Sequence, residues 1–129
     1  MNTSKKNSIM ITGARGFIGG SLMKSYRDEE QSVIGVDLKS NANDILETDL
    51  SNPEKLKEPM KQCDVIIHTA AMVSNAMSDE EMWKTNVLNT SKLIKLAIEY
   101  GIKRFVHISS IVVYGNSATG EINEDTPVN

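Results

Sequence analysis

The chain has 129 residues, of which 40% are hydrophobic and 24% are charged, as is usual for a single globular domain. Its net charge of −3, from 14 basic and 17 acidic side chains, argues against binding to nucleic acid or to an anionic membrane surface. A single cysteine excludes an internal disulfide and fits a reduced, cytoplasmic setting, and no apolar run is long enough for a signal peptide or a membrane span.

Short apolar runs and helical patterns alternate along the first half of the chain. Residues 8–12 and 32–37 are predicted strands, and a third short strand is predicted near Ile45. Between the first two lies a predicted helix at residues 16–29. Its expected buried side is formed by Phe17, Ile18, Leu22 and Tyr26. Asn52 followed by Pro53 predicts the start of a second helix, which Pro59 should end or bend early.

The second half of the chain continues the alternation. Residues 64–69 form an apolar run without polar alternation, which is typical of a strand covered on both faces. Residues 78–100 form the longest helical pattern, with Ser78 and Glu81 as a capping box at its start and Gly101 just past its end. A fifth strand is predicted at residues 104–109, and the polar tail from residue 115 to residue 129 is predicted to be a loop.

Strands that alternate with helices predict an α/β fold with a parallel sheet of about five strands and helices on both faces. Right-handed crossovers between such strands give a doubly wound, Rossmann-like sheet.

The segment "TGARGFIGG" joins the first predicted strand to the first helix. Gly13, Gly16 and Gly19 follow one another at intervals of three residues, which is not the standard G-x-G-x-x-G spacing. Glycines permit a tight turn and a close approach of backbone to a pyrophosphate, and a helix N-terminus favours the negative charge of phosphates. The alternative is a glycine turn that only packs the helix on the strand.

Asp37 ends the second predicted strand, 18 residues after Gly19. A carboxylate at this place accepts hydrogen bonds from both hydroxyls of an adenosine ribose and repels a 2′-phosphate, which favours NAD over NADP. Lys39, two residues further on, leaves NADP open. Residues 1–129 are therefore predicted to form one dinucleotide-binding domain.

Further motifs give the chain a resemblance to the extended short-chain dehydrogenase/reductases, in the NAD-dependent epimerase/dehydratase group. "TGARGFIGG" resembles the family's TGxxGxxG, "TDL" its D-[LIV] step, and "VIIHTAA" its fourth-strand motif. "TNVLNT" resembles NVxGT, "ISSIVVYG" resembles SSxxVYG, and "INEDTP" resembles the acidic segment that follows it. The resemblance covers the N-terminal part of the family.

This resemblance implies contacts with the cofactor. It places Phe17 and Ile18 by the pyrophosphate, Asp49 and Leu50 at the adenine, and Asn86 as a support of the cofactor loop. The residues implied to pass close to the nicotinamide half are Thr69, Ala70 and Ala71. The sequence departs from the family at Asn89, which replaces the glycine of NVxGT, and at Val73, where some sugar epimerases carry a lysine.

Ser110 matches the family's catalytic serine, which polarises a substrate oxygen while a tyrosine and lysine in YxxxK transfer the proton. The residues four positions after the chain's three tyrosines are Glu30, Arg104 and Ala118, so none begins a YxxxK. We therefore expect the chain to be the cofactor-binding portion of a longer enzyme, inactive alone, whose substrate carries a hydroxyl or carbonyl group and could be a nucleotide sugar. Truncation before the later strands and the substrate domain would expose the fifth strand and the long helix, and a homo-oligomer is expected.

Two other functions remain open: a dinucleotide-sensing module without chemistry, and an interaction protein that binds no nucleotide. His68 and His107 lie in strand-like runs and are expected as hydrogen-bonded core residues, since no spacing indicates a metal site. Met72, Met77, Met82 and Trp83 are expected to pack in the core or between helices, the alternative being an apolar wall near the substrate.

Overall fold

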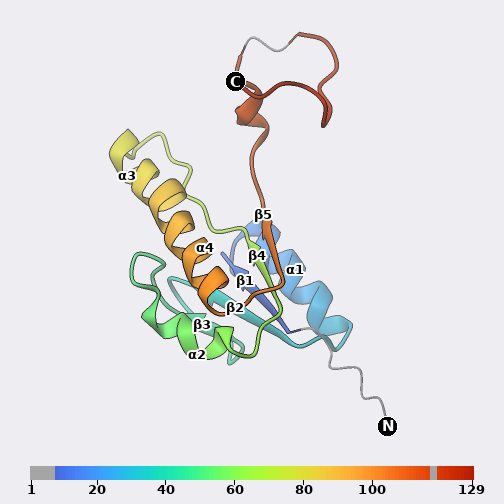
Figure 1. Cartoon of the computed structure of the whole chain (residues 1–129), viewed down its shortest axis with the longest axis vertical. Coiled ribbons are helices and arrows are strands. Elements are labelled where there is room, and N and C mark those ends of the chain that lie inside the picture. The colour runs from blue at the N-terminus through green and yellow to red at the C-terminus, as the bar shows by residue number, and fades with distance from the viewer. Residues whose placement is uncertain (1–7, 117–118) are drawn as a thin grey trace.

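The computed structural model describes residues 8–116 and 119–129, which form a parallel sheet with helices on both faces (Figure 1). The strands are β1 (Ile9–Thr12), β2 (Val33–Asp37), β3 (Ile45–Glu47), β4 (Val65–His68) and β5 (Arg104–His107). They lie in the order β3-β2-β1-β4-β5, and every neighbouring pair is parallel. This is the doubly wound order that the alternating sequence pattern predicts.

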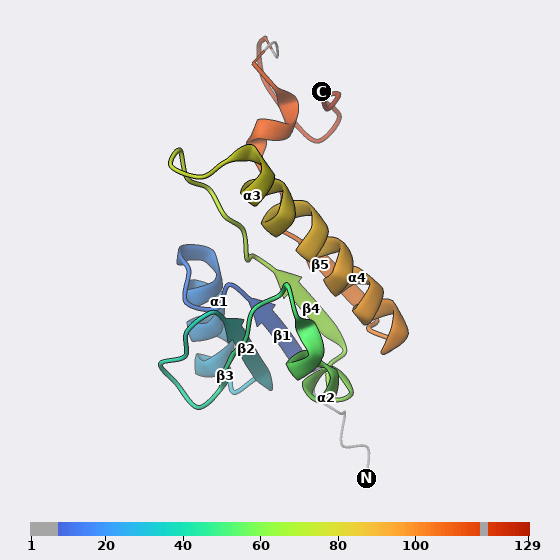
Figure 2. The same cartoon turned by 90° about the vertical axis from the view of Figure 1, so that its left-hand side faces the viewer.

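The helices form two layers around this sheet. Helix α1 (Phe17–Asp28) covers one face, while α2 (Lys57–Met60) and α4 (Asn89–Glu99) cover the other (Figures 1 and 2). Helix α3 (Asp79–Trp83) continues through a π-helical segment, Lys84–Leu88, directly into α4. The long helical pattern at residues 78–100 is therefore confirmed, with a change of helical pitch in its middle.

The core follows the two-residue period of the strands. Met10 and Ile66 are paired in register on β1 and β4 and pack against α2 and α4 with Leu93. Ile11 and Ile67, one residue further along each strand, belong to the second core beside α1. Burial on both faces explains why β4 shows no polar alternation.

The expected buried side of α1 is partly wrong. Phe17 is 94% exposed and Ile18 is 46% exposed, whereas Gly19 and Met23 are the buried residues of the helix. One turn separates Gly19 from Met23, so these two form the stripe on the sheet side. Phe17 and Ile18 instead open onto the cavity described below, which apolar periodicity alone does not distinguish from a core.

Local signals at the ends of the helices have mixed outcomes. The Ser78–Glu81 capping box is present, and Gly101, with φ +69°, ends α4. Pro53 begins a 3-10 turn, Pro53–Leu56, but the Asn52 side chain makes no capping hydrogen bond. Helix α2 ends at Met60, one residue after Pro59, so the early end is confirmed.

Two expectations about buried side chains are also wrong. His107 lies on β5, where only one neighbouring strand is present in the described part of the chain, and its side chain is exposed. Trp83 is exposed at the end of α3, so it is not a core residue. Within residues 8–116 and 119–129, no helix is long and apolar enough to cross a membrane, and no cluster of three or more His, Cys, Asp or Glu side chains is suited to a metal ion.

Candidate functional site

A cavity of about 730 Å³ lies at the carboxyl end of the strands. Here β1 and β4 are neighbours, and the helices that follow them cover opposite faces of the sheet. Such a switch point is where open α/β sheets bind ligands. The predicted site residues that line this one cavity are Gly13, Gly16, Phe17, Ile18, Gly19, Asp37, Asp49, Leu50, Thr69, Ala70 and Ala71.

The glycine turn forms the floor of the cavity between β1 and α1. Gly13 has φ +68°, and a Cβ atom there would lie 2.8 Å from the backbone nitrogen of Ala70. A Cβ atom on Gly19 would collide with the carbonyl oxygen of Gly13 and lie 2.9 Å from Oγ1 of Thr69. Because Gly13 and Gly19 have no side chains, the turn, the start of α1 and the end of β4 can lie in close contact. The amino end of α1, whose first N–H groups have no partner within the helix, opens on the cavity.

Asp37 stands at one side of this turn, at the end of β2. Its Oδ2 atom accepts a hydrogen bond of 2.8 Å from the backbone N–H of Arg15, and its Oδ1 atom accepts one of 2.7 Å from the N–H of Leu38. Two backbone donors thus fix the carboxylate beside the glycine turn. It is acceptor-only when ionised and keeps further lone pairs for a ligand.

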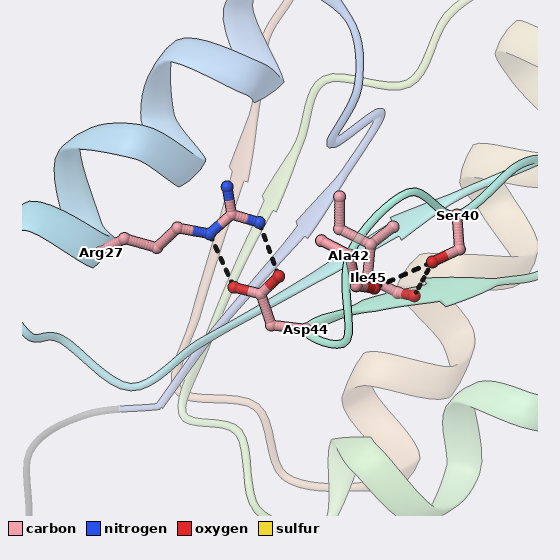
Figure 3. A network of polar contacts seen from close by, with 5 residues as sticks. All are labelled: Arg27, Ser40, Ala42, Asp44 and Ile45. Carbon is pink, nitrogen blue, oxygen red and sulfur yellow. Dashed lines mark hydrogen bonds and ion pairs between the residues drawn. The ribbon is translucent and has the colours of Figure 1, made fainter.

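The loop after Asp37 is anchored to α1 by a polar network (Figure 3). Arg27 donates from Nε and from one terminal nitrogen to the two carboxylate oxygens of Asp44, at 2.7 and 2.6 Å. This hydrogen bonding holds the pKa of Asp44 below its ordinary value. The Ser40 hydroxyl lies 2.9 Å from the carbonyl oxygen of Ala42 and 2.8 Å from that of Ile45, so the loop is tied within itself as well.

Asp49 and Leu50 line the cavity between the end of β3 and the long helix. Asp49 Oδ1 accepts a 2.8 Å hydrogen bond from the Ser51 backbone N–H, and this bond lowers the pKa of Asp49, with a smaller contribution from Lys84 and Lys92. The Lys92 ammonium donates to the Ser51 carbonyl at 3.0 Å. The segment is thereby joined to α4, and its carboxylate stays ionised.

Residues 69–72 form the wall of the cavity beyond β4. The carboxamide of Asn86 is bonded twice to the backbone of Met72: Oδ1 accepts from the N–H at 2.7 Å, and Nδ2 donates to the carbonyl at 2.8 Å. Asn86 therefore holds the wall without lining the cavity itself. Its role as a support for a cofactor stays a prediction, with which this geometry agrees.

Ser110 lies apart from this cavity. It is the residue before a 3-10 turn, Ile111–Tyr114, and its Oγ accepts a 3.2 Å hydrogen bond from the Val112 N–H. This segment extends past the carboxyl edge of the sheet, away from β5 (Figures 1 and 2). Since the hydroxyl accepts the capping bond, its proton is left for another acceptor. The catalytic assignment of Ser110 stays a prediction.

Several cavity residues are absent from the sequence prediction. They are Arg15, Val36, Leu38, Thr48, Thr85 and Asn89. Most are chain neighbours of predicted residues, while Thr85 and Asn89 are one helical turn apart, a spacing that could have marked them. Met72, for which an apolar wall near the substrate was the alternative to core packing, also lines the cavity. Asn89 is buried, and among the described residues its Oδ1 is the one buried side-chain polar atom without a hydrogen-bond partner.

Comparison with known proteins places this arrangement in context. Residues 9–129 match the NAD dependent epimerase/dehydratase family. A UDP-glucose 4-epimerase of Vibrio cholerae is 32% identical over 84% of this chain, and a ketoreductase of Stigmatella aurantiaca that acts on a farnesylated dihydroquinoline oxide is 34% identical over 80%. The solved structure of MoeE5 in complex with UDP-glucose and NAD is 29% identical over 95% of this chain, with a TM-score of 0.86.

The chain is short relative to these proteins. It spans 36% of the length of the Vibrio cholerae epimerase, 33% of the ketoreductase and 42% of MoeE5. The similarity therefore concerns the portion with the glycine turn and the five parallel strands.

Proposed function

The chain belongs to the NAD-dependent epimerase/dehydratase family, and we propose on this premise that it binds NAD as the cofactor portion of an enzyme that moves a hydride to or from a hydroxyl or carbonyl carbon. The observation that carries the proposal is the fixed carboxylate of Asp37 beside the glycine turn, both lining one cavity at the switch point of the sheet. MoeE5, whose structure holds NAD and UDP-glucose, makes a nucleotide sugar the leading substrate class.

The residues present fit a dinucleotide. The glycine turn lets the start of α1 and the end of β4 approach each other closely, and the amino end of α1 opens on the cavity, which suits a pyrophosphate. Asp37 would accept hydrogen bonds from the hydroxyls of the adenosine ribose, and Asp49 with Leu50 would contact the adenine. Residues 69–71 would line the nicotinamide half.

When bound, NAD supplies the hydride acceptor and donor for such a reaction. The chain's own part is to bind and orient it, and Ser110 would polarise the reacting substrate oxygen with the hydroxyl proton that its capping bond leaves free. No tyrosine of this chain is followed by lysine four residues later, so it offers no YxxxK pair to transfer the proton. We therefore expect NAD binding without turnover from the chain alone.

A second candidate is a module that senses dinucleotide without chemistry. These 129 residues carry the glycine turn and Asp37, which suit dinucleotide binding, but no YxxxK pair, so they fit a binding module as well as the cofactor portion of an enzyme. An assay for turnover of a hydroxyl or carbonyl substrate separates the two candidates, because only an enzyme would show turnover when the chain tested includes a YxxxK pair.

The experiment is a fluorescence titration of the chain with NADH and, separately, with NADPH. We expect tighter binding of NADH, because the carboxylate of Asp37 repels a 2′-phosphate. Asp37→Ala should weaken NADH binding by about 1–3 kcal/mol, the scale of hydrogen bonds to a charged group. The matched control is Asp28→Ala, which removes an exposed carboxylate paired with Lys24 outside the cavity. Equal effects of the two variants, or tighter binding of NADPH, would contradict the assignment.

A further inference from the structure

His68, the last residue of β4, takes part in a hydrogen-bonded chain behind the cavity wall. The side chain is 2% exposed, with Nδ1 2.6 Å from Oγ1 of Thr12 on β1 and Nε2 2.9 Å from Oγ1 of Thr90 on α4. Both ring nitrogens are therefore engaged, each by a hydroxyl from a different element of the fold.

The neighbouring hydrogen bonds determine which group donates and which accepts along this series of hydrogen bonds. Thr90 Oγ1 donates its one proton to the carbonyl oxygen of Asn86 at 2.8 Å, so it accepts from the Nε2–H of His68. A neutral imidazole has one N–H, so Nδ1 accepts from the hydroxyl of Thr12. That hydroxyl accepts in turn from the backbone N–H of Ala70 at 3.2 Å. One tautomer of His68 satisfies every bond.

The two ends of this series of hydrogen bonds reach the same wall of the cavity, residues 69–72. Ala70, at one end, lines the cavity directly. Asn86, at the other end, holds Met72 through both of its backbone polar groups. Residues 70–72 are thus tied at each end to a network with His68 at its centre.

We propose that His68, as the neutral Nε2–H tautomer, is a positioning residue that sets residues 70–72 against the cofactor by joining β1 to α4. This role rests on the proposed binding of NAD. Burial supports the neutral form, since it lowers the pKa of His68 to about 4, with a smaller contribution from His107. The ring of His107 stacks on that of His68, with 5.6 Å between the ring centroids. A histidine that only fills the core would stabilise the fold without acting on cofactor affinity.

The test compares His68→Leu with His68→Asn in NADH titrations. Leucine keeps an apolar group in the buried site and loses both hydrogen bonds, whereas the asparagine carboxamide keeps an oxygen close to the Nδ1 position as an acceptor for Thr12. We expect His68→Leu to raise the Kd for NADH by roughly three- to tenfold, and His68→Asn to recover a large part of this loss. Thermal unfolding measured on both variants separates affinity from stability.

Thr90→Val is the second variant if His68→Leu does not fold. Thr90 does not line the cavity, and its loss removes the partner of Nε2, so a raised Kd for NADH would report on the chain of bonds. Nitrogen NMR of the unmodified chain supplies an independent readout: we expect an Nε2–H tautomer for His68 at neutral pH.

The outcomes separate this role from the proposed function. An unmodified chain that does not bind NADH would overturn both. NADH binding that is insensitive to the His68 and Thr90 variants, or an Nδ1–H tautomer, would overturn the positioning role alone.

Discussion

At the glycine turn, close contacts with neighbouring atoms limit which residue types fit at each position. Gly19 and Gly20 are adjacent in α1, yet they differ in what a side chain would meet. A Cβ atom on Gly19 would collide with the Gly13 carbonyl, whereas on Gly20 its nearest neighbour, the Ala14 carbonyl oxygen, would be 3.6 Å away, an ordinary contact.

This difference gives a prediction with a built-in control. Gly19→Ala should destabilise the fold by about 1–3 kcal/mol, as overpacking does, and should also weaken NADH binding. Gly20→Ala should be neutral or stabilising by up to about 1 kcal/mol, because alanine is the better helix former. Urea unfolding and NADH titration of both variants test this, and equal effects would show that the turn has room to adjust.

His68 predicts how stability depends on pH. Its pKa is lowered from 6.5 to about 4 in the folded chain, chiefly by burial, so between these values the unfolded state binds more protons. Stability that is present above pH 6.5 should therefore be lost as the pH falls towards 4, by on the order of 2–3 kcal/mol.

Urea unfolding across this pH window is the measurement, with His68→Asn as the reference. Because the variant has no titrating group at this position, the difference in stability between it and the unmodified chain should narrow as the pH falls. A constant difference between pH 7 and pH 4 would contradict the assignment of a neutral, buried His68.

At the scale of elements, the start of the long helix determines where Asn86 is presented. The capping box at Ser78 is followed by α3 and by the π-helical segment that carries Asn86. Ser78→Ala should cost about 1 kcal/mol of stability, while Ser78→Gly should cost only a few tenths. Thermal unfolding of the two variants checks the cap, and a Ser78→Ala variant as stable as the unmodified chain would show that the hydroxyl contributes nothing there.

Strands and their order could be predicted because each is a short apolar run between a helix and a turn signal. The π-helical segment could not, since no residue type from Lys84 to Leu88 marks a change of pitch. Asn52 carries a capping signature, yet a 3-10 turn with Pro53 at its start forms without using the side chain.

The site could be predicted in large part because its residues belong to short motifs at strand ends. Phe17 and Ile18 line the cavity and not the buried side of α1 that their apolar spacing predicts, because apolar spacing does not distinguish a cavity wall from a core; their place by the pyrophosphate stays a prediction. Thr85 reaches the cavity from the π-helical segment, where the long helix packs over the sheet, and only its spacing to Asn89 in the sequence could have indicated this.

At the scale of the whole molecule, two apolar surfaces remain exposed. β5 has one strand neighbour in the described part of the chain, and Val106 on this strand and Ile108 directly after it are partly exposed. Helix α4 presents Ile94 and Ile98, the latter 75% exposed. Edges and apolar faces of this kind favour association with another chain.

We therefore predict that the chain self-associates, by pairing at β5 or by packing of α4. Light scattering over a concentration series should show a mass that rises above that of a monomer. Ile98→Glu should reduce association through the helix, and Val106→Lys should reduce it through the strand edge. A clean monomer at high concentration would contradict the prediction.

The most direct test of the account is an amide NMR titration of the chain with NAD⁺, because it locates the ligand residue by residue. We predict that shifts concentrate in residues 13–19, at Asp37, at residues 49–50 and in residues 69–71, which line one cavity. Shifts confined to other surfaces, or none at a high concentration of NAD⁺, would contradict the claim that this cavity is a dinucleotide site.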